Sequence, residues 1–433
     1  MKKSLMLFAC VAGLVACTEH DPESADLFGN DPVSIKLTDG KFKDKRDGNE
    51  YSVVKVGNQL WMAENLRYAD SSKTKNLKGN IWCYENSKDS CEKYGPLYSW
   101  TAVLNLESKY ASSEASSNYS YHQNDFQGIC PENWRVPSVD DWNKLKSYFE
   151  SISGAELVGT GMKAVDGWER ADSAAKALNR FGFYALPAGR KNSEDGSFMS
   201  SGKYAYFWSS TQIDDATSYG WTLRYDRDYL ERGEYYKDHG MSLRCVLSVN
   251  YSDAKISGDL DSSYLDKIPF DYGKLEYEGH TYKTIKIDAQ TWMAENMAYK
   301  TDDSWCYNDD EKNCDKYGRL YSFEAAKKVC PEGWRLPTSV EFEGLADFVR
   351  IGKMLRTREG WSDKGEAGMN LWGFNALPAG GRDAGDFFDL TLSSYMWSDN
   401  QSVLLLRYYD DAISVEPKES KSAFSVRCIK EKE

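Results

Sequence analysis

The chain has 433 residues, with 54 basic and 67 acidic side chains and a formal net charge of −13 at pH 7. This length exceeds the roughly 250–300 residues at which one hydrophobic core usually stops growing, so we expect at least two domains. The acidic balance excludes a nucleic-acid-binding surface, which needs excess positive charge. A mean hydropathy of −0.65 excludes a polytopic membrane protein.

Residues 1–16 have the pattern of a lipoprotein signal peptide. Lys2 and Lys3 form a basic start, and an apolar run too short to span a bilayer follows. The sequence LVAC that ends at Cys17 resembles a bacterial lipobox, which implies cleavage before Cys17 and lipid attachment to its sulfur. The alternative is an ordinary signal peptide followed by a chance cysteine.

The predicted anchor also predicts a location. Several acyl chains hold a protein stably at a membrane, whereas one chain holds it only marginally. Thr18 follows Cys17, and an Asp there would resemble an inner-membrane retention signal. We therefore expect an exported, lipid-anchored protein at the outer membrane or cell surface, with the polar residues 17–46 as a tether.

A long internal repeat organises the rest of the chain. The first copy covers residues 47–249 and the second covers 276–431, with a linker at 250–275 that is rich in Asp, Ser and Tyr. Recurring motifs, given for the first and then the second copy, are Gln59–Leu66 and Gln290–Met297, Trp82–Tyr84 and Trp305–Tyr307, Cys130–Pro137 and Cys330–Pro337, Gly182–Gly189 and Gly373–Gly380, and Ser242–Cys245 and Ser425–Cys428. With two large copies, the repeat predicts tandem globular domains.

Cysteines follow the same repeat. Apart from Cys10 and Cys17, eight remain, four in each copy at matched positions. An even number in an exported protein favours disulfides, and four cysteines allow three pairings. A zinc site is the alternative, but no C-x2-C spacing occurs and no His recurs. The pairings that we expect are Cys83–Cys91, Cys130–Cys245, Cys306–Cys314 and Cys330–Cys428.

The motifs GNQLWMAENL, WCY, CP..WR.P, GF.ALPAG and LRC resemble the Fibrobacter succinogenes major paralogous domain, a family of exported bacterial proteins. The resemblance implies two tandem domains of the C-type lectin-like fold. That fold has a mixed, mostly antiparallel sheet, two flanking helices and long irregular loops that bind ligands. It also houses formylglycine-generating enzymes, whose helix start the segment 333–345 resembles. The family implies a fold and a location, but no substrate.

Local patterns agree with an α+β class stapled by disulfides. Ser138 with Asp141 and Thr338 with Glu341 are spaced as capping boxes, so helices are predicted at 139–151 and 339–350. Short alternating or aromatic runs predict strands. These runs are residues 51–56, 221–225, 243–247, 282–287 and 404–409.

Aromatic residues divide into recurring and copy-specific ones. Tryptophans that recur in both copies are predicted to pack the framework, although a site present in both copies would also preserve them. Tyrosines found only in the first copy, among Ser and Asn, suit an adaptable recognition surface; a solvated loop is the alternative. The candidate ligand-binding residues are Tyr110, Tyr119 and Tyr121 in the insert 104–127, and Tyr229, Tyr235 and Tyr236 in the stretch 225–239.

Acidic clusters raise the question of a metal. Their oxygens are the ligands that calcium takes, but charge runs in an acidic protein are usually solvated surface. The residues are Asp214, Asp215, Asp226 and Asp228 in the first copy and Asp410, Asp411 and Glu416 in the second. Calcium stays an open alternative, the metal is unknown, and no other cofactor is expected.

Catalysis has little support in the sequence. Glu64 and Glu295 recur after Trp-Met-Ala, but no second recurring carboxylate has an equally distinctive setting, as a glycosidase would require. We expect these residues, with Asn65 and Asn296, to satisfy backbone groups or an Arg. No G-x-S-x-G motif and no phosphate-binding loop occurs. We therefore do not expect an enzyme.

The sequence thus predicts a surface-exposed lipoprotein with a binding or adhesion role. Its partners would be the membrane, through the lipid, and a polysaccharide or a surface protein recognised by loops; no nucleic acid is expected. The first alternative is a structural cell-envelope protein. Less favoured is a carbohydrate-active or formylglycine-generating-like enzyme, because the cysteines all belong to the matched sets of four.

Overall fold

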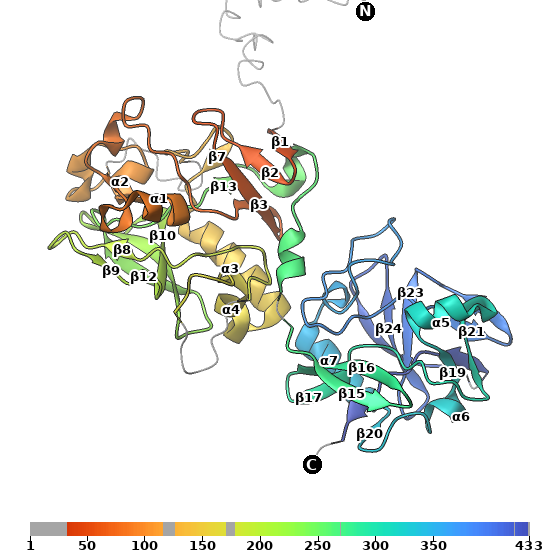
Figure 1. The fold of residues 1–433 in the computed structure, drawn as a ribbon. Helices are drawn as coiled ribbons and strands as arrows, with labels where there is room; N and C mark the ends of the chain where they lie inside the picture. The colour runs from red at the N-terminus through yellow and green to blue at the C-terminus, as the bar shows by residue number, and fades with distance from the viewer. Residues whose placement is uncertain (1–32, 116–125, 170–177, 269, 420, 432–433) are drawn as a thin grey trace, which may run out of the picture.

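The computed structural model describes residues 33–431, except 116–125, 170–177, 269 and 420. The predicted signal peptide, Cys17, Tyr119 and Tyr121 lie outside the described residues. Two α+β units follow each other along the chain (Figure 1). Among the described residues, no helix combines the length and the apolar character needed to cross a membrane.

The first unit is built mainly on a seven-stranded sheet in the order β14-β1-β2-β3-β4-β13-β7, with a three-stranded sheet β10-β11-β12 beside it. Its strand pairs are antiparallel except β1 with β14. The strands are β1 (Ser34–Thr38), β2 (Lys41–Lys43), β3 (Glu50–Val56), β4 (Gln59–Met62), β5 (Ile81–Trp82), β6 (Leu97–Tyr98), β7 (Trp134–Arg135), β8 (Arg190–Lys191), β9 (Phe198–Met199), β10 (Tyr204–Gln212), β11 (Thr217–Arg224), β12 (Glu231–Tyr236), β13 (Val246–Leu247) and β14 (Lys255–Ser257). The helices are α1 (Lys88–Tyr94), α2 (Trp100–Val103), α3 (Val139–Ser153) and α4 (Val158–Met162).

The second unit repeats this plan, with sheets ordered β15-β16-β17-β27-β20, β18-β19-β26-β21-β22 and β23-β24-β25. The strands are β15 (Gly273–Tyr277), β16 (His280–Ile287), β17 (Gln290–Met293), β18 (Ser304–Trp305), β19 (Leu320–Ser322), β20 (Trp334–Arg335), β21 (Gly381–Asp383), β22 (Asp386–Phe388), β23 (Ser393–Trp397), β24 (Ser402–Arg407), β25 (Ile413–Pro417), β26 (Ser422–Phe424) and β27 (Ile429–Lys430). The helices are α5 (Glu311–Tyr317), α6 (Phe323–Ala326) and α7 (Ser339–Val349).

The longest helix of each unit begins with the predicted capping box. In α3 the Asp141 amide donates to Ser138 Oγ at 3.2 Å, and the Ser138 amide donates to Asp141 Oδ2 at 2.8 Å. Thr338 and Glu341 repeat this reciprocal pair in α7. Both helices begin at the predicted residue, because a capping box satisfies backbone donors at a fixed spacing, and they end within two residues of the predicted end.

Two pairs of recurring tryptophans lie in the core, as the framework interpretation predicts, whereas the pairs Trp82 and Trp305, and Trp168 and Trp361, are only partly buried. Trp61, Trp208, Trp292 and Trp397 have no exposed surface, and the Trp61 ring lies 4.8 Å from the Trp142 ring. Each of these side chains removes a large apolar area from water. The framework is therefore the same in both copies.

Four disulfides join the units internally, with the connectivity that we expected from the spacing. They are Cys83–Cys91, Cys130–Cys245, Cys306–Cys314 and Cys330–Cys428. The long bridges close 115 and 98 residues and tie the segment before β7 or β20 to the residue that directly precedes β13 or β27.

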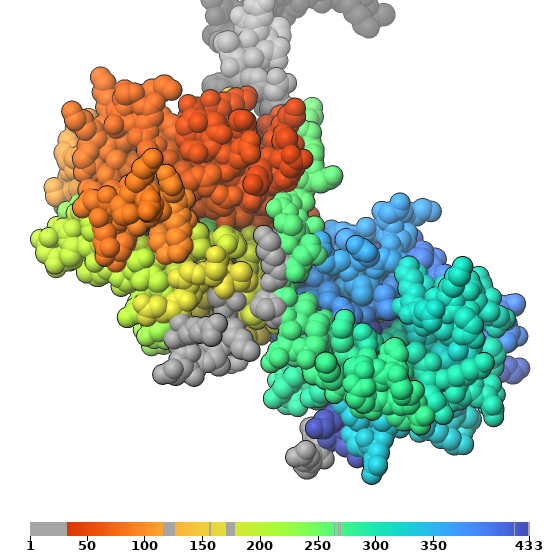
Figure 2. Space-filling view, in the orientation of Figure 1, coloured from red at the N-terminus to blue at the C-terminus, as the bar shows by residue number. Residues whose placement is uncertain are grey.

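Two segments are more ordered than the sequence indicated. Within the predicted tether 17–46, β1 and β2 join the main sheet, and Ile35 and Leu37 are buried. Within the predicted linker 250–275, β14 pairs with β1, and Leu265 and Ile268 are buried. Polar composition hid the two-residue alternation of β1, whose buried residues alternate with exposed ones. Figure 2 shows this linker, in green, between the two units.

Candidate functional site

A cavity of about 360 Å³ opens in the first unit, where the β3–β4 hairpin, the end of α1, the loops around residues 166 and 184, and the linker meet. This volume is at the small end of the range of about 300–1,000 Å³ typical of ligand pockets. Residues that project polar groups into it include Ser52, Glu64, Arg67, Asp166, Tyr184 and Asp261.

Glu64 is held by the hairpin that it follows. Its Oε1 accepts from the Ser52 amide at 2.9 Å, and its Oε2 accepts from Arg67 Nη1 at 2.6 Å. Burial alone would raise the Glu64 pKa, but the Ser52 and Arg67 hydrogen bonds and the Arg67 charge outweigh it and lower that pKa. Glu64 is therefore a fixed anion at neutral pH, partly exposed to the cavity. Both the backbone and the Arg partners expected for it are present.

Tyr184 forms the opposite wall with Asp166. The Tyr184 hydroxyl donates to Asp166 Oδ1 at 2.9 Å. Burial, followed by this carboxylate, raises the pKa of Tyr184 to about 12, so the hydroxyl keeps its proton at neutral pH. The Tyr184 backbone has a φ of 49°, and its amide donates to Asn179 Oδ1 at 2.7 Å. The side-chain amide of Asn179 thus supports a left-handed residue that presents a ring at the cavity.

The loop that carries Tyr184 is pinned from behind by Arg244, whose side chain is fully buried. Arg244 Nη2 donates to the Tyr184 carbonyl at 2.7 Å, and its Nε donates to Asn65 Oδ1 at 3.0 Å. Asn65 Nδ2 donates in turn to the Tyr94 carbonyl at 2.7 Å. The recurring Arg therefore positions the cavity walls from behind, and the recurring Asn both holds the α1 end and lines the cavity.

In the second unit the same network holds a different loop residue. Arg427 Nη2 donates to the Asn375 carbonyl at 2.6 Å, and Arg427 Nε donates to Asn296 Oδ1 at 2.8 Å. Asn375 takes the place of Tyr184 in the recurring GF.ALPAG motif. Glu295 repeats Glu64 by accepting from the Lys283 amide at 3.0 Å.

The counterpart of the cavity in the second unit is filled by the chain itself. The Tyr272 hydroxyl accepts from Asn375 Nδ2 at 2.9 Å, and the Phe270 ring lies 5.5 Å from the Tyr272 ring. Gly373 packs so closely on this pair that a Cβ there would lie 3.2 Å from the Tyr272 hydroxyl and 2.8 Å from Phe270. In the first unit the chain before β3 instead turns back as the β1–β2 hairpin.

The predicted tyrosine sites do not come together in this cavity. Tyr110 packs partly buried against the core of the first unit. Tyr235 is also partly buried, and its hydroxyl lies 2.5 Å from that of Thr222. Tyr229 and Tyr236 are exposed by 38% and 47%, at opposite ends of the stretch that contains β12. Among the described candidates, Tyr235 and Tyr236 share a surface hollow, which also contains His239.

Acidic clusters proposed as calcium ligands are engaged within the chain. Asp214 accepts from the Ala216 and Thr217 amides, and Asp215 accepts from the Glu114 amide. The others also have partners: Arg224 for Asp226, Thr160 for Asp228, Ala412 for Asp410, Lys353 and Arg356 for Asp411, and Arg407 and Lys418 for Glu416. These contacts favour the interpretation of solvated surface and turn-forming residues.

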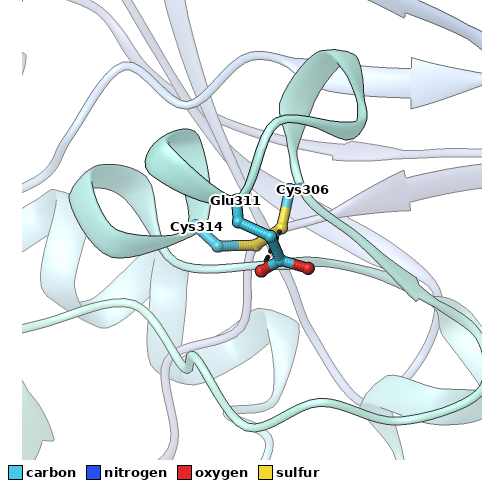
Figure 3. A group of neighbouring side chains, drawn as sticks. All are labelled: Cys306, Glu311 and Cys314. Atoms are coloured by element: carbon cyan, nitrogen blue, oxygen red, sulfur yellow. Dashed lines mark hydrogen bonds between the residues drawn. A yellow bond between two sulfur atoms is a disulfide. The ribbon is translucent and has the colours of Figure 1, made fainter.

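Among the described residues, one cluster has metal-type ligands: Cys306, Glu311 and Cys314 (Figure 3). Glu311 Oε2 lies 3.2 Å from Cys306 Sγ, but the two sulfurs are joined in a disulfide. A disulfide sulfur is not the thiolate that binds metals. Arg319 Nη1 lies 3.5 Å from the Glu311 carboxylate instead, so this group is an ion pair beside a disulfide.

Tyr184 and Asp166 were not predicted as site residues, because the candidate residues all came from the insert 104–127 and the stretch 225–239. The signal was present inside a recurring motif, where Tyr184 faces Asn375 between identical neighbours. A residue that changes within an otherwise unchanged motif indicates a local difference in function more directly than an insert does. No composition rule identifies Ser52 or Asp261, because the fold alone brings them to the cavity.

Comparisons with known proteins give one result. No curated protein and no solved structure matches the chain. The model of the Fibrobacter succinogenes major domain matches residues 54–247 and again residues 285–430, which together are more than half of the chain. Both matched regions coincide with the two units and contain the recurring motifs. The chain therefore belongs to the Fibrobacter succinogenes major domain family, of which it carries two tandem copies.

Proposed function

We propose that this protein is an exported, lipid-anchored binding protein of the cell surface, and that its first copy is the binding copy. The observation that carries the proposal is the contrast at one position of the repeat. The first copy has a polar cavity there, whereas the second fills its counterpart with Tyr272.

Anchoring and export rest on the N-terminal sequence. The basic start, the apolar run and the LVAC sequence that ends at Cys17 support cleavage and lipidation. Four disulfides fit a protein that folds in an oxidising compartment. Residues 18–33 would then lie between the lipid and β1.

The electrostatics favour binding over hydrolysis at this cavity. A glycosidase general acid needs a raised pKa so that it holds a proton near pH 7. The Glu64 pKa is lowered instead, because the Ser52 amide and Arg67 stabilise the anion. Asp166 is exposed and accepts from Tyr184. This pair offers fixed hydrogen-bond acceptors, which suit recognition of a polar ligand.

The experiment is retention of soluble residues 18–433 on a panel of soluble and insoluble polysaccharides, with calcium and with chelator. Ser52→Lys places the second copy's residue in the cavity, and its amide can still bind Glu64. Lys283→Ser is the matched control in the second copy. We expect saturable retention that Ser52→Lys lowers at least tenfold and that Lys283→Ser leaves unchanged.

Other outcomes identify what would replace the proposal. If Tyr236→Ala removes retention and Ser52→Lys does not, the exposed loops are the site and the cavity is not. If the chelator removes retention, the acidic clusters bind calcium. If no polymer retains the protein and no surface protein does so, a structural envelope role replaces the binding role.

A further inference from the structure

The second copy shows what kind of group this position of the fold accepts. Tyr272 inserts a six-membered ring that carries one hydroxyl, and Asn375 Nδ2 donates to that hydroxyl at 2.9 Å. The ring packs beside Phe270, and Lys283 Nζ lies 5.7 Å from its centre. The counterpart of the cavity therefore matches a flat ring with a polar substituent at its inner end.

The first copy offers the same shape with a different lining. Tyr184 replaces Asn375, so the wall gains an aromatic face. Ser52 replaces Lys283 and Arg67 replaces Ala298, so one cation is exchanged for another, which pairs with Glu64. Asp261 of the linker closes one side, where it packs so closely on Gly40 that a Cβ there would lie 2.4 Å from the Asp261 Cβ. No side chain of the described residues takes the place that Tyr272 takes in the second copy.

The charges of this lining select among ring ligands. Four carboxylates line the cavity, against the two cations Arg67 and Lys93. The carboxylates are Glu64, Glu92, Asp166 and Asp261. A carboxylate oxygen has lone pairs left after one hydrogen bond, so Glu64 and Asp166 can each accept from a further donor. A ligand rich in hydroxyl donors satisfies these oxygens, whereas an anion is repelled.

Apolar groups complete the match. Val53, Ala63 and Leu186 line the cavity beside the Tyr184 ring. A sugar ring presents an apolar face of C–H groups and a rim of hydroxyls, and aromatic rings with a polar tip suit such a surface. A purely phenolic ring would cover the apolar part, but its single hydroxyl could supply a further donor to only one of Glu64 and Asp166.

We propose that the first-copy cavity binds one ring of a neutral hexopyranose, such as a chain end or a side residue, and rejects uronic acids. The hydroxyls donate to Glu64 and Asp166, and the C–H face lies on Tyr184. This assignment rests on the proposed binding function and adds the class of ligand. A cavity of about 360 Å³ limits the recognised unit to a short segment of a glycan.

The test uses soluble residues 18–433 with methyl glucopyranoside, methyl galactopyranoside and methyl mannopyranoside, the corresponding uronates, and p-cresol as the phenolic probe. Saturation-transfer NMR detects binding and calorimetry measures Kd. We expect at least one neutral glycoside to bind with a Kd of about 1 mM, as the size of a single ring allows. Its uronate should bind at least tenfold more weakly.

Asp166→Asn sharpens the test because it removes one negative charge and keeps the side-chain size. It should reduce the neutral-over-uronate ratio at least threefold, whereas Glu359→Gln at the matched position of the second copy should not change it. Equal binding of a uronate, binding of p-cresol alone, or no binding of any glycoside overturns the ligand class. If the wild type is still retained on a polymer and Ser52→Lys abolishes that retention, the proposed binding function stands although the ligand class is wrong. If the protein binds neither a glycoside nor a polymer, both the ligand class and the binding function are overturned.

Discussion

Arg244 holds the Tyr184 loop of the first copy, and Arg427 holds the Asn375 loop of the second through the same set of hydrogen bonds. The walls are thus built alike, yet one copy keeps a cavity and the other is filled by Tyr272. This difference shows that the recurring residues of the repeat specify a frame, by which we mean the walls held by these hydrogen bonds. What the frame encloses is decided by residues outside the recurring set and by the path of the chain before each hairpin.

We expect the largest loss of stability from removal of a long disulfide, which each copy contains. Replacing Cys130 and Cys245 by Ser should lower the free energy of unfolding by roughly 4–5 kcal/mol, because the bridge closes 115 residues. Replacing Cys83 and Cys91 by Ser should lower the free energy of unfolding by only roughly 2–3 kcal/mol, because this bridge closes a short loop. Urea unfolding of the oxidised variants measures both. Equal losses would contradict this dependence on loop length.

The second prediction tests whether the frame is equivalent in the two copies. Arg244→Met removes a charged donor from the buried Asn65 oxygen and from two backbone carbonyls, so the first unit should lose about 3 kcal/mol. Arg427→Met should cost the second unit a similar amount. Denaturant unfolding gives the two values. A loss in one copy only would show that the shared geometry does not carry shared energetics.

Much of the frame was predictable from residues that act over short distances or that recur. The Ser138–Asp141 and Thr338–Glu341 spacings fixed two helix starts, and the matched cysteines indicated the bridges. The cavity was not predictable, because its walls come from segments far apart in the chain. Nothing local marks Asp261 or Ser52 as neighbours, and the closure by Tyr272 depends on a chain path that only the folded packing decides.

The third prediction concerns pH and compares the two capping boxes. Hydrogen bonds from Arg335, together with the Thr338 amide, lower the pKa of Glu341 to about 2, although burial opposes this. Because the folded pKa lies below the ordinary value of about 4.5, the carboxylate stabilises the fold above that pH. This stability is lost as the pH falls from about 4.5 to about 2.

Glu341→Gln should therefore cost about 1.5–3 kcal/mol at pH 7 and flatten the decline of stability in that acid range. Denaturant unfolding at pH 7, 4.5 and 3 measures this. Asp141 has the corresponding partners Arg135 and Ser138, and its pKa is also lowered, so Asp141→Asn should act in the same direction on the first unit. A variant with an unchanged acid slope would show that Arg335 does not stabilise the anion.

The smallest effect on stability, and the sharpest test of the comparison, comes from Tyr272→Ala. Tyr272 is only partly buried, so we expect the free energy of unfolding of the second unit to fall by about 1 kcal/mol.

The Tyr272→Ala variant should also acquire a cavity that p-cresol fills, since this molecule corresponds to the missing side chain. Binding to the folded state raises stability by mass action, so p-cresol should raise the Tm of Tyr272→Ala by more than it raises the Tm of the wild type. Toluene should act more weakly, because it gives Asn375 Nδ2 no acceptor. Equal rescue by both compounds would mean that shape alone decides this position. No rescue would mean that the frame closes when Tyr272 is absent, and then the first-copy cavity would depend on its own lining residues and not on the frame that both copies share.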